Sequence, residues 1–340
     1  MPSVLLLHTK QEYATSLAEA VESLNNDYEV TVVSREPVHD RFSHLLDREY
    51  DLVQVDELLV NGVFASGASI YPGTPFVVSI RGWADYTNAH EQYGFLRDAF
   101  IRLRSTAALR RASSVVFLSE CTHRKFKQHY HVEGSTVVSR PIDIAYYRDN
   151  YDRRSGNIVD DSTFDLLTVT NLRYEKKFEG IRTILEGLTD LFARYDELRY
   201  AVAGDGVYRQ NLEEFLDTYE YANQVHVLGF CEDIPSLLSS ADAFIYVSYL
   251  DSLGTVVLEA QAAGLPVIGG DAVGVPAALG DAGILCSPTP DGVCDAVEQV
   301  LIDDEFRAEL AASSRNKMNT YNERCAERHV EVWNDVLDYS

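Results

Sequence analysis

The sequence predicts an α/β protein made of two doubly wound domains with parallel sheets. Short apolar, β-branched runs alternate with helical stretches along most of the 340 residues, which is typical of βαβ units. A polar stretch between Arg148 and Thr163 has no apolar period, and the alternating pattern restarts after it. The length also fits two hydrophobic cores, at roughly 150 residues per domain. We therefore expect two sheet domains joined near residue 150.

The apolar runs predict six strands in each half. Each run is short, rich in Val, Ile and Leu, and bounded by polar or turn-forming residues, as buried parallel strands are. The first half contains the runs Ser3–His8, Glu29–Ser34, Leu52–Val55, Phe76–Ile80, Val115–Leu118 and Thr136–Ser139. The second half contains Asp165–Thr170, Leu198–Ala203, Val225–Leu228, Ala243–Val247, Pro266–Ile268 and Gly283–Leu285.

Helical stretches fill the intervals between these runs. They cover Tyr13–Leu24, Phe95–Arg111, Thr122–Tyr130, Ile181–Tyr195, Arg209–Tyr219, Ile234–Ser239, Val256–Ala263, Asp291–Ile302, Asp303–Met318 and Arg324–Leu337. We place the first domain at residues 1–150 and the second at 160–323. The last helix, about 324–340, is expected to pack back on the first domain, with Trp333 as its anchor.

The composition is strongly acidic, with 53 Asp and Glu against 29 Lys and Arg and a net charge of −24. This balance argues against a nucleic-acid-binding protein, which needs cations for the phosphates. Only six residues are lysines. Carboxylate-rich, lysine-poor surfaces suit high salt, where screening weakens self-repulsion. We therefore hypothesise a high-salt cytoplasm; an acidic protein for an unrelated reason is the alternative.

Targeting and redox signals point to the cytoplasm. The first residues lack a basic region and carry only a four-residue apolar run, so we interpret them as a buried strand rather than a secretion signal. No run approaches the 18 or more apolar residues of a membrane helix. The five cysteines form no CxxC pair, which fits free thiols. We assign no metal site and no cofactor.

Two candidate phosphate-binding segments follow strands of the second half. Gly204-Asp205-Gly206 lies between a strand and a helix, where glycines let the backbone approach a ligand and the helix offers free N–H groups. A simple turn is the alternative. Lys176-Lys177, near Arg173, forms a cationic cluster suited to a diphosphate. A solvated helix start is the alternative there. The first strand lacks a GxGxxG motif after it, which disfavours a nicotinamide dehydrogenase.

The sharpest candidate is the pair Asp251 and Glu259. Asp251 follows a buried strand, and Glu259 stands eight positions later, about two helical turns away. Glu259 lies among apolar residues and needs a polar partner, for which ribose hydroxyls would serve. A structural carboxylate that caps a neighbouring loop is the alternative.

The stretch DSLGTVVLEAQAAGLPVI, residues 251–268, closely resembles the acid, seven residues, Glu signature of the family 4 retaining glycosyltransferases. LLTVTNLRYEKKFEG resembles that family's Gly-Arg-Leu…Lys-Gly segment, AVAGDGVYRQNLE its Gly-Asp-Gly turn, and SSVVFLSECTHRKF a strand end of its first domain. The similarity covers about residues 115–290. It implies the GT-B fold, two Rossmann-like domains whose sheets face across a cleft.

The resemblance implies a role for each matching residue. Glu259 would bind the nucleotide ribose, Asp251 would contact the donor sugar, and Lys176 would hold the diphosphate. The donor side would be completed by the Gly204-Asp205-Gly206 turn, by Phe230 and by the backbone of Leu253, Gly254, Thr255 and Val256.

The sequence also departs from the family pattern. Asp251 is one methylene shorter than the family's usual Glu, and Asn171 replaces the family's Arg, so Arg173 is expected to supply that second charge. Arg81 stands where the family often has a His-Gly pair. With Lys10 and Asp85, it is a first-domain candidate.

The implied reaction is transfer of a sugar from a nucleoside diphosphate sugar to a glycan, lipid-linked or protein-linked acceptor, with retained anomeric configuration and no metal. The rival functions are a sugar-nucleotide epimerase on the same fold and a non-catalytic sugar-binding protein.

One region opposes the global charge. From Arg97 to Lys127 eight residues are basic and two acidic, a net charge of +6. Aromatic and aliphatic residues interleave with the arginines of Phe95–Arg111, which could place this helix on an anionic membrane surface or direct it to a lipid-phosphate acceptor. A helix that packs its apolar stripe on the sheet and turns its arginines to the acidic remainder is the alternative.

Overall fold

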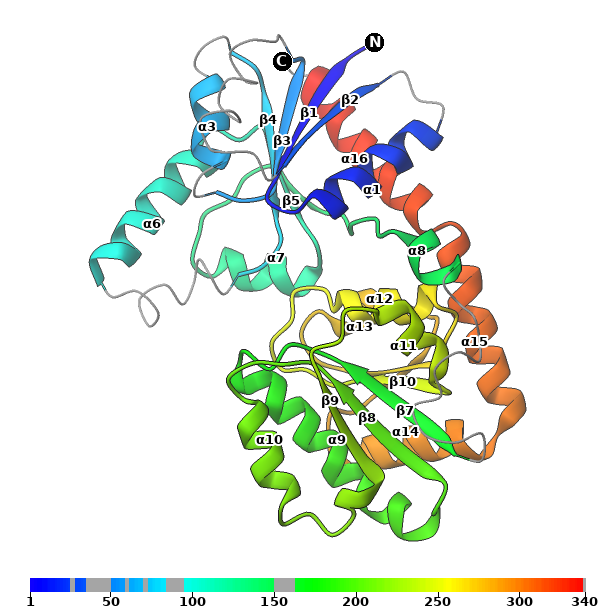
Figure 1. Ribbon diagram of the computed structural model, residues 1–340. Helices are drawn as coiled ribbons and strands as arrows, with labels where there is room; N and C mark the ends of the chain where they lie inside the picture. Colours follow the sequence, from blue (N-terminus) through cyan, green and yellow to red (C-terminus); the bar gives the residue numbers. More distant parts are fainter. Residues whose placement is uncertain are drawn as a thin grey trace. The chain divides into compact units, whose positions relative to one another are not determined.

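The computed structural model describes residues 1–24, 28–34, 50–58, 61–69, 73–83, 95–149 and 163–338. The chain forms two compact units (Figure 1). Unit 1 contains residues 1–143 and 320–340, and unit 2 contains residues 144–319. Each is described by itself.

Unit 1 is built on a six-stranded parallel sheet in the order β2-β1-β3-β4-β5-β6. Its strands are β1 Ser3–His8, β2 Glu29–Ser34, β3 Leu52–Val55, β4 Phe76–Ile80, β5 Ser114–Phe117 and β6 Ser135–Val137. The order reverses between β1 and β3, which is where a crevice opens at the carboxyl ends of such strands. The four central strands are almost wholly buried, because helices cover both faces.

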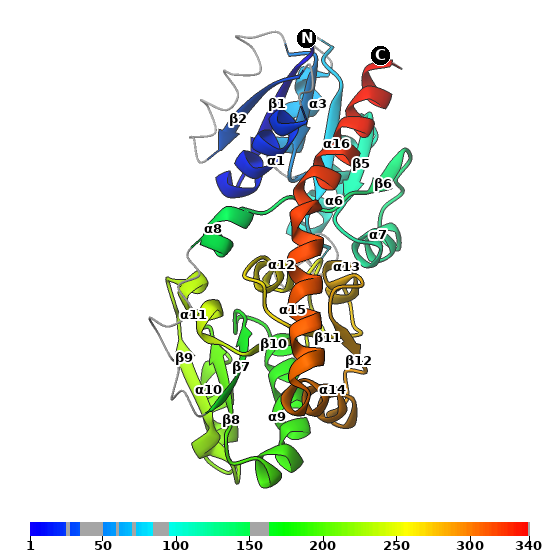
Figure 2. The same cartoon turned by 90° about the vertical axis from the view of Figure 1, so that its right-hand side faces the viewer.

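The helices of unit 1 are α1 Gln11–Ser23, α3 Asn61–Ala68, α6 Phe95–Leu109, α7 Glu120–Lys127 and α16 Tyr321–Asp338. Figure 2 shows α16, the last helix of the chain, lying along this unit beside α1. Trp333 of α16 is fully buried in the core of the sheet face that α1 also covers. Its Nε1 donates to Gln54 Oε1 at 2.7 Å, so the polar edge of the indole also has a partner.

Unit 2 contains a second six-stranded parallel sheet, in the order β12-β11-β10-β7-β8-β9. Its strands are β7 Phe164–Val169, β8 Leu198–Ala203, β9 Val225–Gly229, β10 Ala243–Tyr246, β11 Val267–Gly270 and β12 Ile284–Cys286. The order reverses between the neighbours β7 and β10, as in doubly wound folds. The predicted α/β architecture with two doubly wound sheets is therefore confirmed.

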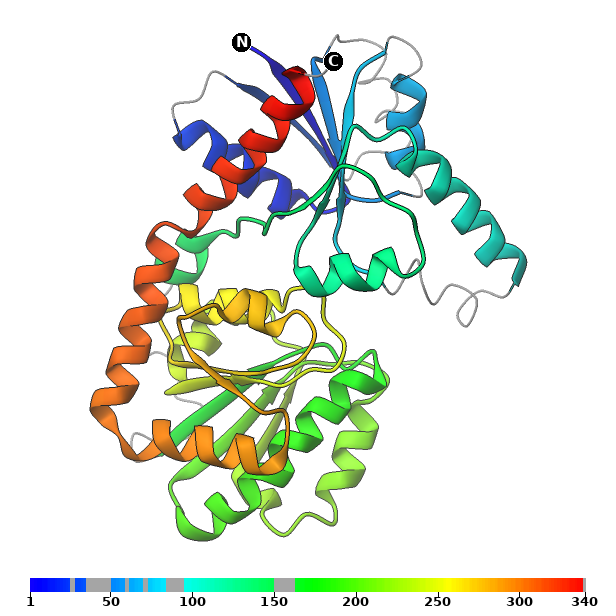
Figure 3. The same ribbon diagram turned by 180° about the vertical axis from the view of Figure 1, so that it is seen from behind.

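Helices cover both faces of the second sheet. They are α8 Ile144–Asp149, α9 Glu175–Arg194, α10 Arg209–Leu216, α11 Ile234–Ser240, α12 Thr255–Ala262, α13 Val275–Leu279, α14 Pro290–Ile302 and α15 Asp304–Asn319, with a 3-10 turn at Ala222–Gln224. Figure 3 shows α9 and α14 on the same side of the sheet, where their apolar faces form one core with β7, β8 and β10.

Three short helices were not predicted from the sequence: α3, α8 and α13. Helix α3 reads NGVFASGA, in which small residues replace the usual alternation of large apolar and polar side chains. Helix α9 begins at Glu175 rather than Ile181, so Lys176 and Lys177 belong to its first turn. No helix within the described ranges is both long and apolar enough to cross a membrane.

A glycine lets α9 approach the end of β10. A Cβ at Gly180 would lie 2.0 Å from the carbonyl oxygen of Val247, so any side chain there would push the helix away. We expect Gly180→Ala to destabilise the protein by about 1–3 kcal/mol, as overpacking does. The matched control is Gly67→Ala in α3, where nothing lies within 4 Å; it should be neutral or stabilising by up to about 1 kcal/mol. Denaturant unfolding in molar KCl measures both, and equal stability of the two variants would contradict the steric account.

Two buried histidines make unit 1 sensitive to acid. Burial lowers the pKa of His8, at the end of β1, to about 4, and burial also lowers the pKa of His329 of α16 to about 3. The unfolded chain takes up these protons below about pH 6.5 while the folded chain does not. Stability present above pH 6.5 is therefore lost as the pH falls toward 4, by about 3 kcal/mol for His8 alone.

Urea unfolding at several pH values tests this expectation. The double variant His8→Asn, His329→Asn should lose much of the pH dependence, while His131→Asn, at an exposed side chain, should keep it. An unchanged slope in the double variant would show that other groups cause the acid sensitivity.

Candidate active site

The candidate site of unit 2 lies at the carboxyl ends of β7 and β10. Four segments converge there: the loop after β7 with the first turn of α9, the Gly204–Gly206 turn after β8, the loop after β10, and the start of α12. This is the reversal point of the strand order, where open α/β sheets bind their ligands.

Lys177 of α9 points inward and joins two of these segments. The residue is only 7% exposed, and its Nζ donates to Asp251 Oδ2 at 2.6 Å. It also donates to the hydroxyl of Tyr246, the last residue of β10. Tyr246 Oη in turn donates to Asp251 Oδ2 at 2.7 Å. One carboxylate oxygen thus receives two buried donors.

The second oxygen of Asp251 shapes the loop that precedes α12. Asp251 Oδ1 accepts from the amide of Gly254 at 2.9 Å, and the Asp251 carbonyl accepts from the amide of Gly274 at 3.1 Å. Gly254 caps α12 with a left-handed backbone, φ 76°, which glycine adopts at low cost. A Cβ at Gly274 would lie 2.3 Å from the Ser252 backbone, so the loop rests directly on that glycine. These contacts fix the start of α12, whose amides and dipole suit an anion.

The ion pair keeps both partners charged. Burial alone would raise the pKa of Asp251, but the ammonium of Lys177 and the Tyr246 and Gly254 hydrogen bonds lower it below its usual value. Burial would lower the pKa of Lys177, yet Tyr246 and Asp251 raise it above its usual value. Burial raises the pKa of Tyr246 to about 12. Asp251 is therefore a carboxylate and Lys177 an ammonium at neutral pH.

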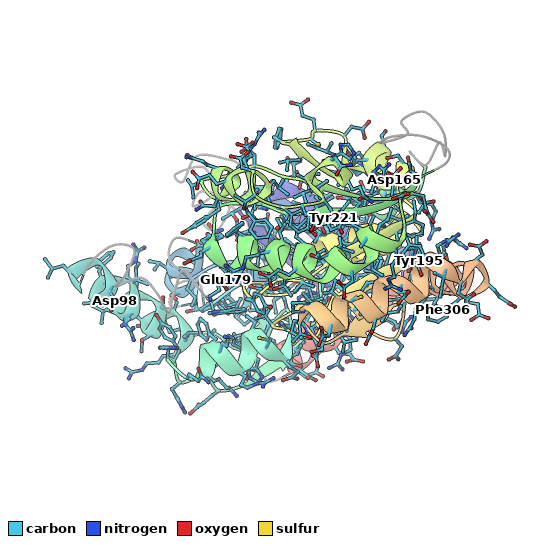
Figure 4. All side chains as sticks on the ribbon, turned by 90° about the horizontal axis from the view of Figure 1, so that it is seen from below. Asp98, Asp165, Glu179, Tyr195, Tyr221 and Phe306 are labelled. Carbon is cyan, nitrogen blue, oxygen red and sulfur yellow. The ribbon has the colours of Figure 1, made fainter. Side chains whose placement is uncertain are left out.

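The other cations predicted here lie at the surface. Lys176 is exposed, and its Nζ pairs with Glu179 of the next helical turn at 2.7 Å; Figure 4 labels Glu179 on α9. Arg173, in the loop before α9, is also exposed. The structure brings Lys177, not Lys176, to Asp251, while Lys176 and Arg173 flank that buried pair from the solvent side.

The Gly204-Asp205-Gly206 turn packs on the loop after β7. A Cβ at Gly204 would lie 1.7 Å from the carbonyl oxygen of Thr170, and one at Gly206 would lie 2.3 Å from the backbone of Leu172. The amide of Leu172 donates to the Asp205 carbonyl at 3.0 Å. These glycines bring two loops into direct backbone contact, so they support the loop after β7 whether or not they touch a ligand.

The remaining donor-side candidates lie on or near α12. Glu259 is half-buried in its second turn, Thr255 and Val256 are half-buried in its first turn, and Leu253 is buried beneath the loop. Phe230, directly after β9, is 73% exposed. Among the residues described, no group of three or more His, Cys, Asp and Glu side chains is arranged to hold a metal ion.

Unit 1 has a polar cluster at its own reversal point. Asp56, directly after β3, is buried, and its Oδ2 accepts from the backbone N–H of Thr9 at 2.9 Å and from the Thr9 hydroxyl at 2.8 Å. Arg81, after β4, donates to the Thr9 hydroxyl at 2.7 Å and lies 3.4 Å from Asp56 Oδ2. Lys10 is exposed beside the Tyr13 ring. Asp85 lies outside the described residues.

Sequence reasoning missed Lys177, Tyr246 and Asp56. A signal existed for Asp56, because a carboxylate directly after an apolar strand marks the ligand-binding edge of a parallel sheet. For the two adjacent lysines, the correct start of α9 would have shown that Lys177 lies about 100° around the helix from Lys176. Only one of them can then face the core.

Removing one partner of the buried pair should be more harmful than removing both. Lys177→Met leaves the Asp251 carboxylate buried without its cation, and we expect a loss of about 3–5 kcal/mol in unfolding free energy. Adding Asp251→Asn should recover part of that loss, because no unpaired charge remains. The destabilisation of Lys177→Met should also shrink at low pH, where Asp251 can take a proton.

Urea unfolding of the two single variants and the double variant in molar KCl measures this coupling. Lys176→Met is the matched control and should change stability by less than about 1 kcal/mol, since its ion pair is exposed. Additive losses in the double variant would show that the two side chains do not interact energetically.

Comparisons with known proteins agree with this architecture. The family described as "Glycosyl transferases group 1" matches residues 151–317, which is about half of the chain. The alpha-D-kanosaminyltransferase of Streptomyces kanamyceticus is 27% identical over 74% of this chain and 69% of its own. The N-acetyl-alpha-D-glucosaminyl L-malate synthase of Bacillus anthracis is 25% identical over 53% of this chain and 47% of its own. For the matching component of the human phosphatidylinositol N-acetylglucosaminyltransferase the values are 25%, 49% and 33%.

Solved structures share the fold over the whole chain. HepE of Anabaena, in complex with UDP and glucose, matches with a TM-score of 0.74 over 98% of this chain and 100% of its own, at 17% identity. The sucrose-phosphate synthase of Thermosynechococcus elongatus matches with the same TM-score over 100% of both chains, at 14% identity. At these identities the likeness shows the fold, and the sequence relatives show the enzyme class. The chain belongs to the group 1 glycosyltransferases, with the GT-B fold.

Proposed function

We propose that this glycosyltransferase moves a sugar from a nucleoside diphosphate sugar to an acceptor hydroxyl or phosphate with retention of the anomeric configuration. One observation carries the proposal. The ion-paired Asp251 and the start of α12 meet at the reversal point of the second sheet, eight positions before Glu259. An anion-binding helix start, a fixed carboxylate and a second acid two turns later fit a diphosphate, a sugar and a ribose in that order.

The donor's diphosphate is assigned to the surface cations and the start of α12. Lys176 is held by an exposed ion pair with Glu179, a contact worth little in water, so it can exchange that partner for a phosphate. Arg173 adds a second mobile cation, with a planar guanidinium suited to phosphate oxygens. The amides from Leu253 to Val256 complete the cradle. The UDP in HepE supports a nucleotide donor.

The chemistry then needs only cations and fixed dipoles from the protein. The bond between the anomeric carbon and the phosphate oxygen breaks, and a bond to the acceptor oxygen forms on the same face of the sugar. The transition state is oxocarbenium-like, and negative charge collects on the departing diphosphate. Lys176, Arg173 and the α12 dipole stabilise that charge, while Asp251 orients the sugar. Glu259 binds the ribose.

The acceptor is a glycan, a lipid-linked or a protein-linked group. The name of the human relative, which contains phosphatidylinositol, supports the lipid-linked class. The Asp56, Thr9 and Arg81 cluster of unit 1 is the acceptor-side candidate. We place the enzyme in the cytoplasm, with peripheral membrane contact through Phe95–Arg111.

A nucleotide titration tests the donor. We expect UDP or GDP to raise the melting temperature in molar KCl, because a ligand that binds only the folded state stabilises it. ADP and NAD serve as nucleotide controls. A shift with NAD alone, or no shift at saturation, would remove the donor site. Conversion of the donor without any acceptor would identify an epimerase, and sugar binding without nucleotide a binding protein.

Two substitutions test the residues. Asp251→Asn and Glu259→Gln should each reduce transfer at least a hundredfold, the scale of losing one transition-state contact. Glu259→Gln should also weaken nucleotide binding, whereas Asp251→Asn should act chiefly on the sugar. Glu305→Gln, an exposed acid of α15, is the control and should behave as wild type. Transfer at the wild-type rate in either site variant would refute that residue's role.

A further inference from the structure

Helix α6 of unit 1 has two apolar faces, and only one of them is used by the fold. Ile101, Ala108 and Leu109 are buried against the core of unit 1, where α6 also packs on α3. Leu96, Phe100 and Leu103 remain exposed, at 84%, 55% and 70%. The packing of this helix on its own unit therefore accounts for one half of its apolar residues and leaves the other half unexplained.

The exposed residues form a continuous stripe. Leu96, Phe100 and Leu103 are spaced i, i+4 and i+7, which places them within a sector about 60° wide on a helix of 3.6 residues per turn. The buried residues of α6 occupy the opposite side. Asp98, labelled in Figure 4, belongs to that buried side, where Arg102 pairs with it at 2.9 Å. The stripe itself contains no charged residue. Figures 1 and 3 show α6 running out past the sheet of its unit.

Positive charge borders the stripe. The guanidinium of Arg104 lies 5.1 Å from the centre of the Phe100 ring, so its charge accompanies the exposed aromatic side chain. Arg110 and Arg111 follow the helix and are exposed, and α7 adds the exposed Arg124 and Lys127. In a chain with a net charge of −24, this concentration of cations around an apolar stripe is a local exception.

We infer that the exposed stripe of α6 docks this protein on an anionic lipid bilayer. Leu96, Phe100 and Leu103 enter the boundary between headgroups and acyl chains, and the bordering arginines pair with anionic headgroups. Long basic side chains suit that position because their stems lie along apolar surface while their charge stays at the headgroups. The inference rests on the proposed function and deepens it by naming the surface on which a lipid-linked acceptor would be met.

The size of the stripe favours a membrane over a second copy of the chain. Three large side chains offer about 400 Å² of apolar surface. A stable protein interface needs about 800 Å² from each partner. A bilayer requires no matching shape, and a short apolar stripe with basic neighbours is enough for reversible binding.

High salt changes the balance of the two contributions. At molar salt the Debye length is about 3 Å, so charges act only at contact. Repulsion between the acidic remainder of the protein and an anionic bilayer is then screened, and so is long-range attraction by the arginines. The apolar stripe becomes the main source of binding, which explains why large side chains are kept in water at this surface.

Sedimentation with lipid vesicles tests the inference without donor or acceptor. In molar KCl the protein should bind phosphatidylcholine vesicles that contain phosphatidylglycerol. The variant Phe100→Ser, Leu103→Ser should bind at least tenfold more weakly. The matched control Ile302→Ser, Leu285→Ser removes two exposed apolar side chains of unit 2 and should bind as wild type. At the lowest KCl concentration at which the protein stays folded, vesicles of phosphatidylcholine alone should bind several-fold more weakly.

Each other outcome would overturn the inference. Absence of binding by the wild type, or equal binding by the stripe variant, would remove the membrane role. A concentration-dependent dimer that the stripe variant abolishes, without vesicle binding, would show that a second copy covers the stripe. Melting curves in molar KCl with and without UDP or GDP verify that the variants are folded. Because vesicle binding needs no nucleotide, its failure and the failure of the donor site are distinguishable.

Discussion

The buried ion pair between Lys177 and Asp251 is the interaction on which the site of unit 2 depends. It ties the first turn of α9 to the loop after β10, and the second oxygen of Asp251 holds the turn that starts α12. Two buried charges are costly to remove from water, so the pair is favourable only with its additional hydrogen bonds in place. Tyr246 and Gly254 supply those bonds. The backbone contacts at Gly180 and Gly204 in turn allow the segments to come this close.

The two sheets solve the same problem in similar ways. In each unit an aspartate stands in a loop where the strand order reverses, Asp56 after β3 and Asp251 after β10. Each carboxylate accepts a hydrogen bond from a backbone amide, of Thr9 and of Gly254, and each has a cation from a different segment, Arg81 and Lys177. Polar side chains thus fix loops that would otherwise be free to move at the ligand-binding edge.

The architecture was readable from the sequence because buried parallel strands are short apolar runs that need no knowledge of their neighbours. The positions of Asp251 and Glu259 were readable for the same reason, since each follows a recognisable element. The choice between Lys176 and Lys177 was not, because it depends on where α9 begins, and element boundaries are set by tertiary contacts. The exposed stripe of α6 could not be separated from its core-facing residues either. Both are apolar at helical spacing, and only packing distinguishes them.

Lysine is rare in this chain, and the few that remain have uneven duties. Lys177 braces the site, and Lys317 of α15 donates to Gln261 of α12 at 2.8 Å and to the Leu279 carbonyl at 3.1 Å. A flexible stem that ends in three donors can join several acceptors inside a protein, which a planar guanidinium does less readily. The scarcity of lysine is therefore a property of the surface, and the interior retains it where it has a structural task.

The placement of α16 also has a consequence for biosynthesis. Unit 1 begins with the first residue to leave the ribosome, yet its core includes Trp333, near the end of the chain. Unit 2 is made of one uninterrupted stretch and can fold while it is being synthesised. The sheet of unit 1 must wait, with the apolar face that α16 later covers still open. A nascent chain of this protein therefore depends for longest on protection at the unit that was made first.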